Sequence, residues 1–240
     1  TSAAVADAAG VAPEWWILRR DGRIDGRTTN VDQAVRTLLV KSNAAAIAAC
    51  VDDLVLHAGS VAGPAVAVLI VGDPDAGKST LTAALARRGA TYLTDEAARV
   101  RRRPDGGPGE EAGFEVVPYP KPLSLAQGSM DLQAEVLGSD AGEPELVGGH
   151  LPPAALGSPI GRRPVPVVAV VLPDRSRPAE ALEPVEAVDA ALRLAGQVFN
   201  LPARGGDGLA LLASLVTAVP IVELGTEGLH GSLALIEALL

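Results

Sequence analysis

The feature that most constrains the fold of this chain is one segment, Gly72-Asp73-Pro74-Asp75-Ala76-Gly77-Lys78-Ser79. It satisfies the pattern G-x-x-x-x-G-K-[S/T] at every fixed position, and this pattern requires a strand before the loop and a helix after it. The run 66–71 is apolar and rich in β-branched residues, which is typical of a buried strand. The run 81–88, LTAALARR, has the apolar spacing of a helix. The sequence therefore predicts an α/β fold built around one strand–loop–helix unit.

The residue types of this loop suit the binding of a nucleoside triphosphate. Gly72 and Gly77 allow the backbone to curl so that consecutive N–H groups converge on an anion, and the following helix adds the positive end of its dipole. The amine of Lys78 reaches the β- and γ-phosphates, and the hydroxyl of Ser79 is a ligand for Mg²⁺. The alternative is a glycine-rich turn that binds no ligand. The predicted ATP- and Mg²⁺-binding residues are Gly72, Asp73, Asp75, Ala76, Gly77, Lys78, Ser79 and Thr80.

Two further positions carry candidate chemistry. Asp95 and Glu96 follow the strand expected at 91–94, with Asp95 sixteen residues beyond Ser79. Adjacent carboxylates can divide the work of a phosphotransferase, one activating an acceptor hydroxyl and the other holding the metal; the alternative is an exposed acidic turn. His57 lies on the strand expected before the loop strand, where a structural and a catalytic role are both open.

Composition excludes several classes of protein. Aromatic residues make up only 2% of the chain against 48% apolar residues, so the core must consist of Val, Leu, Ile and Ala. The net charge of −9 argues against a nucleic-acid or anionic-lipid partner. Cys50 is the single cysteine, which excludes an internal disulfide and fits a cytoplasmic, reducing setting. The run 54–72 contains nineteen residues without a charged side chain, but Gly63-Pro64 divides it, which favours two buried strands over a membrane span.

The chain is expected to form one α/β domain with an N-terminal extension. Residues 1–13 resemble a disordered leader, and 14–53 is expected to form a strand and a helix packed on the core. The helix begins after Asn30, with Gln33 completing a capping box. Residues 54–240 form the main domain, and 126–163 is expected to be a long mobile loop. The other predicted elements are a strand at 114–117, a buried strand at 166–172, and helices at 184–199, 208–218 and 232–240.

Three segments together resemble the kinase domain of the HPr serine kinase/phosphorylase family: LHAGSV (56–61), GDPDAGKST (72–80) and RRGATYLTDEAARV (87–100). In that family a histidine precedes the first glycine of the loop by fifteen residues, which is the separation of His57 and Gly72. Asp95 matches the first residue of the family's Asp-Asp pair, and Glu96 replaces the second. The resemblance is strong over 54–100. Beyond it, PYPKPLSL (118–125) and HLPPAALG (150–157) are similar to smaller related proteins, which include serine kinases of lasso-peptide precursors.

The resemblance implies a role for each matched residue. Asp95 would accept the proton of the acceptor hydroxyl, and His57 would orient Asp95 or the transferred phosphoryl group. Ser79 and Glu96 would coordinate Mg²⁺, with Asp95 as a further ligand, and Lys78 would neutralise phosphate charge. The implied fold is a P-loop kinase domain like the C-terminal domain of HPr kinase and phosphoenolpyruvate carboxykinase, with a mixed, curved β-sheet flanked by helices. The spacing of these motifs along the chain, taken without the resemblance, favours a doubly wound parallel sheet.

The sequence departs from the family at three points. The stretch before residue 54 is too short for the separate N-terminal domain of the full-length family. Thr80 stands where the family commonly has an acidic residue. The glycine-rich C-terminal signature loop, linked to the reverse, phosphate-consuming reaction, is not found. These departures argue against HPr as the substrate and against a dephosphorylating activity.

Several basic residues have two interpretations. Arg99 and Arg101–Arg103 follow the acidic pair and either attract an acidic acceptor or form a solvated strand end. Lys121 lies between prolines and either contacts the nucleotide or acceptor or belongs to a rigid turn. Arg162-Arg163 either supplies charge to the transition state or ends the long loop.

The remaining histidines and the tryptophan pair give weaker signals. His150 and His230 are too isolated in the sequence to indicate a metal site. Trp15-Trp16 is expected to provide one core and one interface residue, which leaves a homo-oligomer open.

Three functions fit these patterns. The first is an ATP-dependent, Mg²⁺-requiring serine/hydroxyl kinase that phosphorylates a peptide or small protein, including a ribosomally synthesised, lasso-type precursor. The second is a P-loop ATPase or a nucleotide-regulated binding module. The third is a kinase of small molecules. No nucleic-acid or membrane partner is expected for any of them.

Overall fold

The computed structural model describes residues 14–103, 113–124 and 150–240, and its central element is the strand β9 (Val165–Pro178). The first residues of β9 pair antiparallel with β8 (Phe114–Val117). Its later residues pair parallel with β5 (Ala67–Val71) on one side and with β11 (Ile221–Glu227) on the other. The predicted buried strand at 166–172 and the strand at 114–117 are therefore confirmed.

The remaining strands extend this arrangement into one mixed sheet. The order is β3 (Leu54–Leu56), β7 (Ala98–Arg102), β8, β9, β5, β4 (Ala58–Ala62) and β6 (Thr91–Thr94), and β10 (Leu182–Pro184) pairs antiparallel with β11. Among the strand pairs of the described residues, only β5–β9 and β9–β11 are parallel. The mixed sheet differs from the doubly wound parallel sheet that spacing alone favours.

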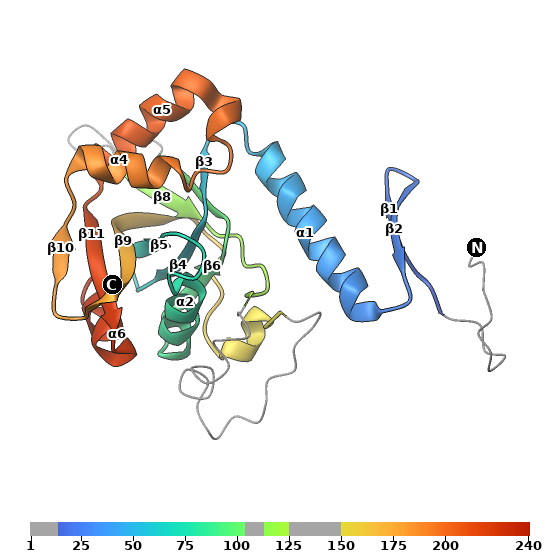
Figure 1. Ribbon diagram of the computed structural model, residues 1–240, viewed down its shortest axis with the longest axis horizontal. Coiled ribbons are helices and arrows are strands. Elements are labelled where there is room, and N and C mark those ends of the chain that lie inside the picture. The colour runs from blue at the N-terminus through green and yellow to red at the C-terminus, as the bar shows by residue number, and fades with distance from the viewer. Residues whose placement is uncertain (1–13, 104–112, 125–149) are drawn as a thin grey trace.

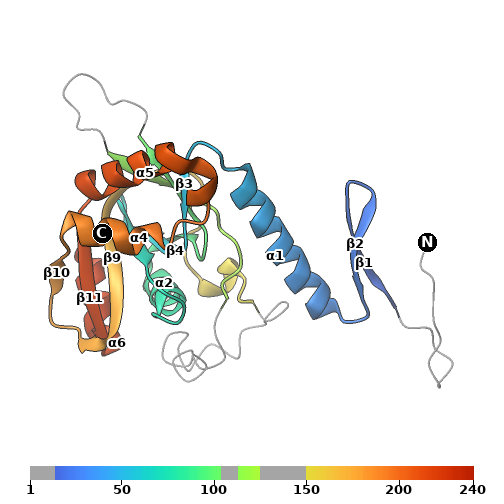
Figure 2. The ribbon, with the colours of Figure 1, turned by 45° about the horizontal axis from the view of Figure 1, so that its top comes forward.

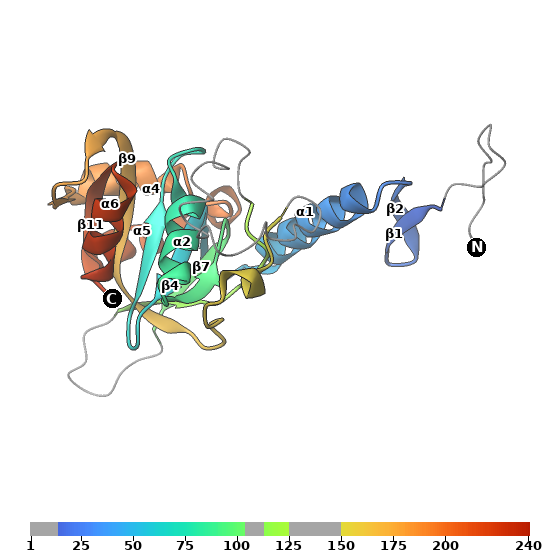
Figure 3. The ribbon, with the colours of Figure 1, turned by 90° about the horizontal axis from the view of Figure 1, so that it is seen from below.

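Two stretches of chain cross together from one half of the sheet to the other. β3 leads through His57 into β4, and β6 leads through residues 95–97 into β7. Leu56 is paired with Ala98, and Ser60 is paired with Thr94, in the same antiparallel register. The residues between these pairs, 57–59 and 95–97, therefore lie opposite each other, where the chain passes from β3 to β4 and from β6 to β7. Figure 3 shows β4 and β7 from below.

Helices cover both sides of the sheet (Figures 1 and 2). α2 (Lys78–Arg87) and α6 (Leu229–Glu237) bury Leu81, Leu85 and Leu233 against one face. α4 (Ala187–Ala195) and α5 (Leu201–Ala218) bury Leu194, Leu212 and Leu215 against the other. The core is aliphatic, as the composition predicts.

The C-terminal helices begin at other residues than the sequence predicts. The helix predicted from 184 begins at Ala187, because Leu182–Pro184 pairs with β11 instead. The helix predicted at 208–218 begins at Leu201 and is kinked at Gly205, whose φ of 54° is not helical. The last helix runs from Leu229 to Glu237 rather than from 232 to 240.

The N-terminal extension is a hairpin followed by a long helix. β1 (Trp16–Arg20) and β2 (Arg23–Thr28) pair antiparallel around Asp21-Gly22, and α1 runs from Val31 to Ala49. Asn30 caps α1 by accepting a hydrogen bond of 3.0 Å from the Gln33 N–H. The Gln33 side chain bonds Thr28 instead of returning to the Asn30 backbone, so only half of the predicted capping box forms.

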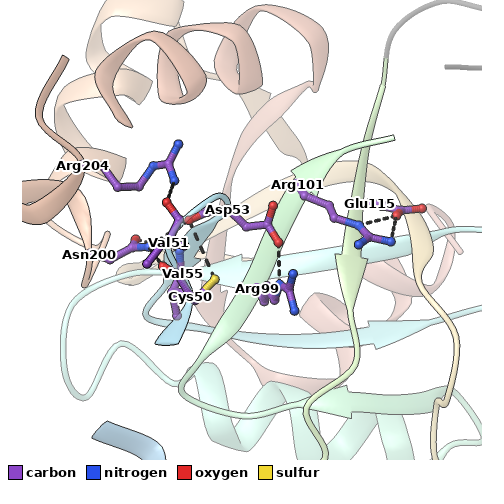
Figure 4. A network of polar contacts seen from close by, with 9 residues as sticks. All are labelled: Cys50, Val51, Asp53, Val55, Arg99, Arg101, Glu115, Asn200 and Arg204. Atoms are coloured by element: carbon purple, nitrogen blue, oxygen red, sulfur yellow. Dashed lines mark hydrogen bonds and ion pairs between the residues drawn. The ribbon is translucent and has the colours of Figure 1, made fainter. Parts of the chain in front are cut away.

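The structure differs from the expected packing of this extension on the core. α1 projects from the side of the domain, and Ala34 is its only buried residue (Figure 1). The C-terminal end of α1 is tied to the sheet through Asn200 (Figure 4). The Asn200 amide donates to the carbonyl oxygens of Cys50 and Asp53, at 2.9 and 2.8 Å, and its oxygen accepts from the Val55 N–H at 3.0 Å.

The apolar run 54–72 forms three strands, β3, β4 and β5, rather than the two that the sequence predicts. The division at Gly63-Pro64 is confirmed, whereas the further division at His57 was not predicted. Within the described residues, every helix is too short or too polar to cross a membrane. The predicted leader at 1–13 and residues 126–149 of the predicted loop lie outside the described residues. The rest of that loop contains a 3₁₀ helix, Pro153–Leu156.

The contact between β4 and α2 yields a first prediction. A Cβ added at Gly59 would lie 2.0 Å from the Thr82 hydroxyl oxygen, which is buried and has no hydrogen-bond partner. Because such overpacking forces the backbone apart, Gly59→Ala should lower the free energy of unfolding by about 1–3 kcal/mol in urea denaturation. The loss should be smaller in a Thr82→Ala background, which removes the clashing oxygen.

Gly26→Ala serves as the matched control, because a Cβ there meets its nearest neighbour at an ordinary 3.6 Å. Equal losses at Gly59 and Gly26, or an undiminished loss in the Thr82→Ala background, would contradict the close approach of α2 to β4.

Candidate active site

The loop Gly72–Ser79 joins the end of β5 to the start of α2, so the strand and helix that the pattern requires are both present. Asp75 and Gly77 have positive φ angles of 65° and 96°, and Gly77 is the N-cap of α2 without a capping side chain. The first N–H groups of α2 therefore face the loop without a side-chain acceptor. Such a helix start is a suitable place for an anion.

Lys78 folds over this loop. Its amine donates to the carbonyl oxygens of Gly72 and Asp73, at 2.7 and 2.8 Å. Burial lowers the pKa of Lys78, although the charges of Asp95 and Asp73 oppose that shift. The loop is braced from outside, because Gln197 donates to the Asp73 carboxylate at 2.8 Å. The ammonium group of Lys78 is thus held inside the curve of the loop.

Asp95 is the most buried acidic side chain of the site, with an exposed fraction of 2%. The Ser79 hydroxyl donates to Asp95 Oδ1 at 2.9 Å, and the Ser124 N–H donates to Oδ2 at 3.3 Å. Burial raises the pKa of Asp95, even though nearby Lys121 and these two donors favour the carboxylate. The predicted loop serine and the predicted base are therefore in direct contact.

Glu96 points to a different partner. Its carboxylate lies 2.5 Å from the amine of Lys121, and its backbone has a φ of 85°. The Tyr92 hydroxyl donates to the Lys121 carbonyl oxygen at 2.7 Å, which fixes the proline-bounded turn. Lys121 therefore lies in a rigid turn beside the acidic pair, and its contact with a nucleotide or acceptor stays a prediction.

His57 lies between β3 and β4, and the register of the neighbouring pairs places it opposite Ala97, the residue after Glu96. The backbone N–H of His57 donates to the Gln197 carbonyl oxygen at 2.7 Å, and the centroid of its ring is 5.4 Å from that of the Phe199 ring. Burial lowers the pKa of His57, and the charge of Lys78 lowers it further, so the ring is neutral at neutral pH. The predicted histidine, lysine, loop serine and acidic pair therefore come together.

The arginines after the acidic pair have structural partners instead (Figure 4). Arg99 pairs with Asp53 at 2.5 Å, and Arg101 pairs with Glu115 at 2.7 Å. Arg102 lies over the Phe114 ring and bonds Ser214. Arg99, Arg101 and Arg102 therefore each have a partner within the fold, which neither interpretation of the sequence included, and a role in attracting an acidic acceptor stays a prediction.

Sequence reasoning missed two residues beside the acidic pair. Ser124 contributes the backbone N–H to Asp95, and its hydroxyl oxygen lies 3.0 Å from Nδ1 of His150. His150 was considered only as a metal ligand. The pairing of Leu123 with Leu151, far apart in sequence, brings the two residues together. Ser124 lies in the motif PYPKPLSL and His150 lies in the motif HLPPAALG, but no spacing rule predicts that these two separate segments meet.

The donor atoms fit a magnesium ion bound with a nucleotide. Among residues 14–103, 113–124 and 150–240, no group of three or more His, Cys, Asp or Glu side chains could hold a metal alone. Mg²⁺ in nucleotide sites uses one or two protein carboxylates together with phosphate and water oxygens. The hydroxyl of Ser79 and the carboxylate of Asp95 are two adjacent hard oxygen donors, and Glu96 is the next residue.

Comparisons with known proteins give structural similarity but no sequence match. No family model and no curated protein matches the chain. A solved structure, the Hpr(Ser) kinase/phosphatase from Coxiella burnetii, is similar over 77% of this chain and 87% of that chain. The sequence identity is 13% and the TM-score is 0.37, which makes this a distant structural similarity.

The burial of Asp95 yields a second prediction, for stability against pH. A carboxyl whose pKa is raised in the folded state contributes its full stability below the ordinary value of 3.8, and this contribution is lost as pH rises through the raised pKa. Asp95→Asn removes the cost of burying the charge. Its free energy of unfolding should therefore rise relative to wild type as pH increases above 3.8, by at most about 1.4 kcal/mol per pH unit.

Urea denaturation from pH 4 to pH 8, about half a unit apart, measures this difference. Asp207→Asn, at an exposed position of α5, is the control and should follow the wild type. A variant at Asp95 that loses stability relative to wild type as pH rises would show that hydrogen bonding outweighs burial.

Proposed function

We propose that this protein is an ATP-dependent, Mg²⁺-requiring kinase that transfers the γ-phosphate to a hydroxyl of a peptide or small protein. The observation that carries the proposal is the 2.9 Å hydrogen bond between Ser79 and Asp95. It connects the helix start after a phosphate-loop motif to a buried carboxylate of raised pKa. Phosphoryl transfer requires these two elements side by side, a cradle for the phosphates and an acid–base group at the γ-position.

The loop residues would hold the triphosphate. The backbone N–H groups at the start of α2 would bind phosphate oxygens, and Lys78 would exchange its two carbonyl partners for the β- and γ-phosphates. Ser79 and Glu96, with Asp95 beside them, are the residues that would hold Mg²⁺. When bound, the metal supplies charge neutralisation at the transferred phosphate.

Asp95 would receive the proton of the acceptor hydroxyl. Its burial supports this role, because a base is most useful when its pKa lies closer to the working pH than that of a solvated carboxylate. His57 would orient the acceptor or the phosphoryl group. Lys121, paired with Glu96, adds positive charge at the same edge. The preferred acceptor is a serine in a peptide, including a lasso-type precursor peptide, as the family resemblance implies.

A second candidate function rests on the same contact. A P-loop ATPase holds its metal with the loop Ser/Thr and an Asp at the end of a neighbouring strand, which Ser79 and Asp95 also resemble. The two functions differ in what activates turnover. An ATPase releases phosphate steadily without an acceptor, whereas a kinase releases little until an acceptor hydroxyl is supplied.

The third prediction tests Asp95 in catalysis. Asp95→Asn should retain ATP binding in calorimetry, since the loop and Lys78 are intact, yet lose about 10²–10⁴-fold in phosphate transfer to serine peptides. Mass spectrometry measures the gain of one phosphate per peptide. Asp207→Asn should transfer at the wild-type rate. Undiminished transfer by Asp95→Asn would remove Asp95 from the mechanism.

The fourth prediction separates the metal ligand from the base. Glu96→Gln should transfer phosphate at a similar rate in excess Mg²⁺ but need about 10–100-fold more Mg²⁺ for half-maximal rate. Glu115→Gln, which removes a carboxylate that pairs with Arg101 away from the loop, is the control. An unchanged Mg²⁺ requirement in Glu96→Gln would leave Ser79 and Asp95 as the protein ligands.

A further inference from the structure

A cavity of about 250 Å³ lies where the end of α1 meets the outer face of β3, β7 and β8. A single water needs only about 10–15 Å³ of such volume, and pockets that bind whole small molecules have volumes of roughly 300–1,000 Å³. The cavity therefore has the size for one large side chain rather than for a nucleotide. Ala46, Ile47 and Ala49 of α1 form one wall.

The strand register fixes the floor of this cavity. Arg99 of β7 is paired with Val55 of β3 and with Val117 of β8, so the three residues share one face of the sheet. Because successive side chains of a strand point to opposite faces of the sheet, the neighbouring Leu54 and Val100 lie on the other face, in the core. The floor is consequently apolar except for Arg99, which is already paired with Asp53 at 2.5 Å. Asp52 also lines the cavity and adds a second charged side chain to it.

The same cavity adjoins the acidic pair. Ala97, which lines it, directly follows Glu96 along the chain. Tyr119, on the other side, donates its backbone N–H to the Leu93 carbonyl oxygen. Burial raises the pKa of the Tyr119 hydroxyl, and the charge of Glu96 raises it further. The cavity and the carboxylates thus share one edge of the domain.

The wall of the cavity is held in place by hydrogen bonds (Figure 4). Asn200 links Cys50 and Asp53 at the end of α1 to Val55 in the floor. Arg204 donates to the Val51 carbonyl oxygen. A site whose walls are fixed before binding loses less conformational entropy when a ligand enters, which favours selective binding.

We infer that this cavity is an acceptor subsite, which binds a large apolar side chain of the peptide close to the phosphorylated serine. The inference rests on the proposed kinase function and adds the chemistry of the substrate to it. An acidic side chain is disfavoured, because Asp52 lines the cavity and Asp53 already neutralises Arg99. Leu, Met or Phe gains most from leaving water here.

The fifth prediction follows from this inference. The probe is a set of short peptides with one fixed serine, in which each flanking position is varied in turn among Ala, Leu, Phe, Asp and Lys. Wild type should phosphorylate peptides with Leu or Phe at one flanking position about ten-fold or more faster than those with Ala. Ala49→Phe, which fills the cavity from α1, should abolish this preference and leave ATP binding unchanged.

Ala48→Phe is the matched control, because Ala48 is exposed on the same helix turn but does not line the cavity. It should keep the wild-type preference. Equal phosphorylation of all peptides by wild type would overturn the subsite while leaving the kinase function standing. The same loss of preference in Ala48→Phe would also overturn it. Phosphate release without transfer to any peptide would overturn the kinase function, and the acceptor subsite with it.

Discussion

The hydrogen bond between the Ser79 hydroxyl and the Asp95 carboxylate is the interaction on which the rest of the site depends. Ser79 stands at the start of α2, and Asp95 stands where β6 leaves one half of the sheet for the other. The segments 57–59 and 95–97 lie opposite each other in one antiparallel register, at the points where β3 passes to β4 and β6 passes to β7. This crossing places Asp95 within reach of the first turn of α2, which brings the phosphate-loop motif to a carboxylate.

Burial gives the residues of this edge their chemical character. Withdrawal from water raises the pKa of Asp95 and lowers those of His57 and Lys78, so each group moves toward its neutral form. A polyanionic ligand would reverse part of this for Lys78, because phosphate charge favours the ammonium form. Lys78 therefore favours an anion near the loop, and the carboxylates beside it favour a cation. A nucleotide bound together with a divalent metal satisfies both demands.

Local sequence signals predicted the units of this fold better than their arrangement. The strand–loop–helix unit, the Asn30 cap and the buried β9 follow from residue type and spacing within one segment. β10 and β11 were missed because their pairing partners are distant in sequence, and the same reason hid Ser124 and His150. The mixed sheet came from resemblance to a family, since spacing cannot distinguish parallel from antiparallel neighbours. The placement of α1 was not predictable, because its alanine-rich face is compatible with packing and with exposure alike.

The projection of α1 sets a length scale for anything that touches both ends of the molecule. With 19 residues and a rise of about 1.5 Å per residue, α1 is about 28 Å long, so it holds the β1–β2 hairpin about that far from its own C-terminal end. An extended chain spans that length with about eight residues. A polypeptide that contacted both the hairpin and the C-terminal end of α1 would therefore need about eight residues between the two contacts.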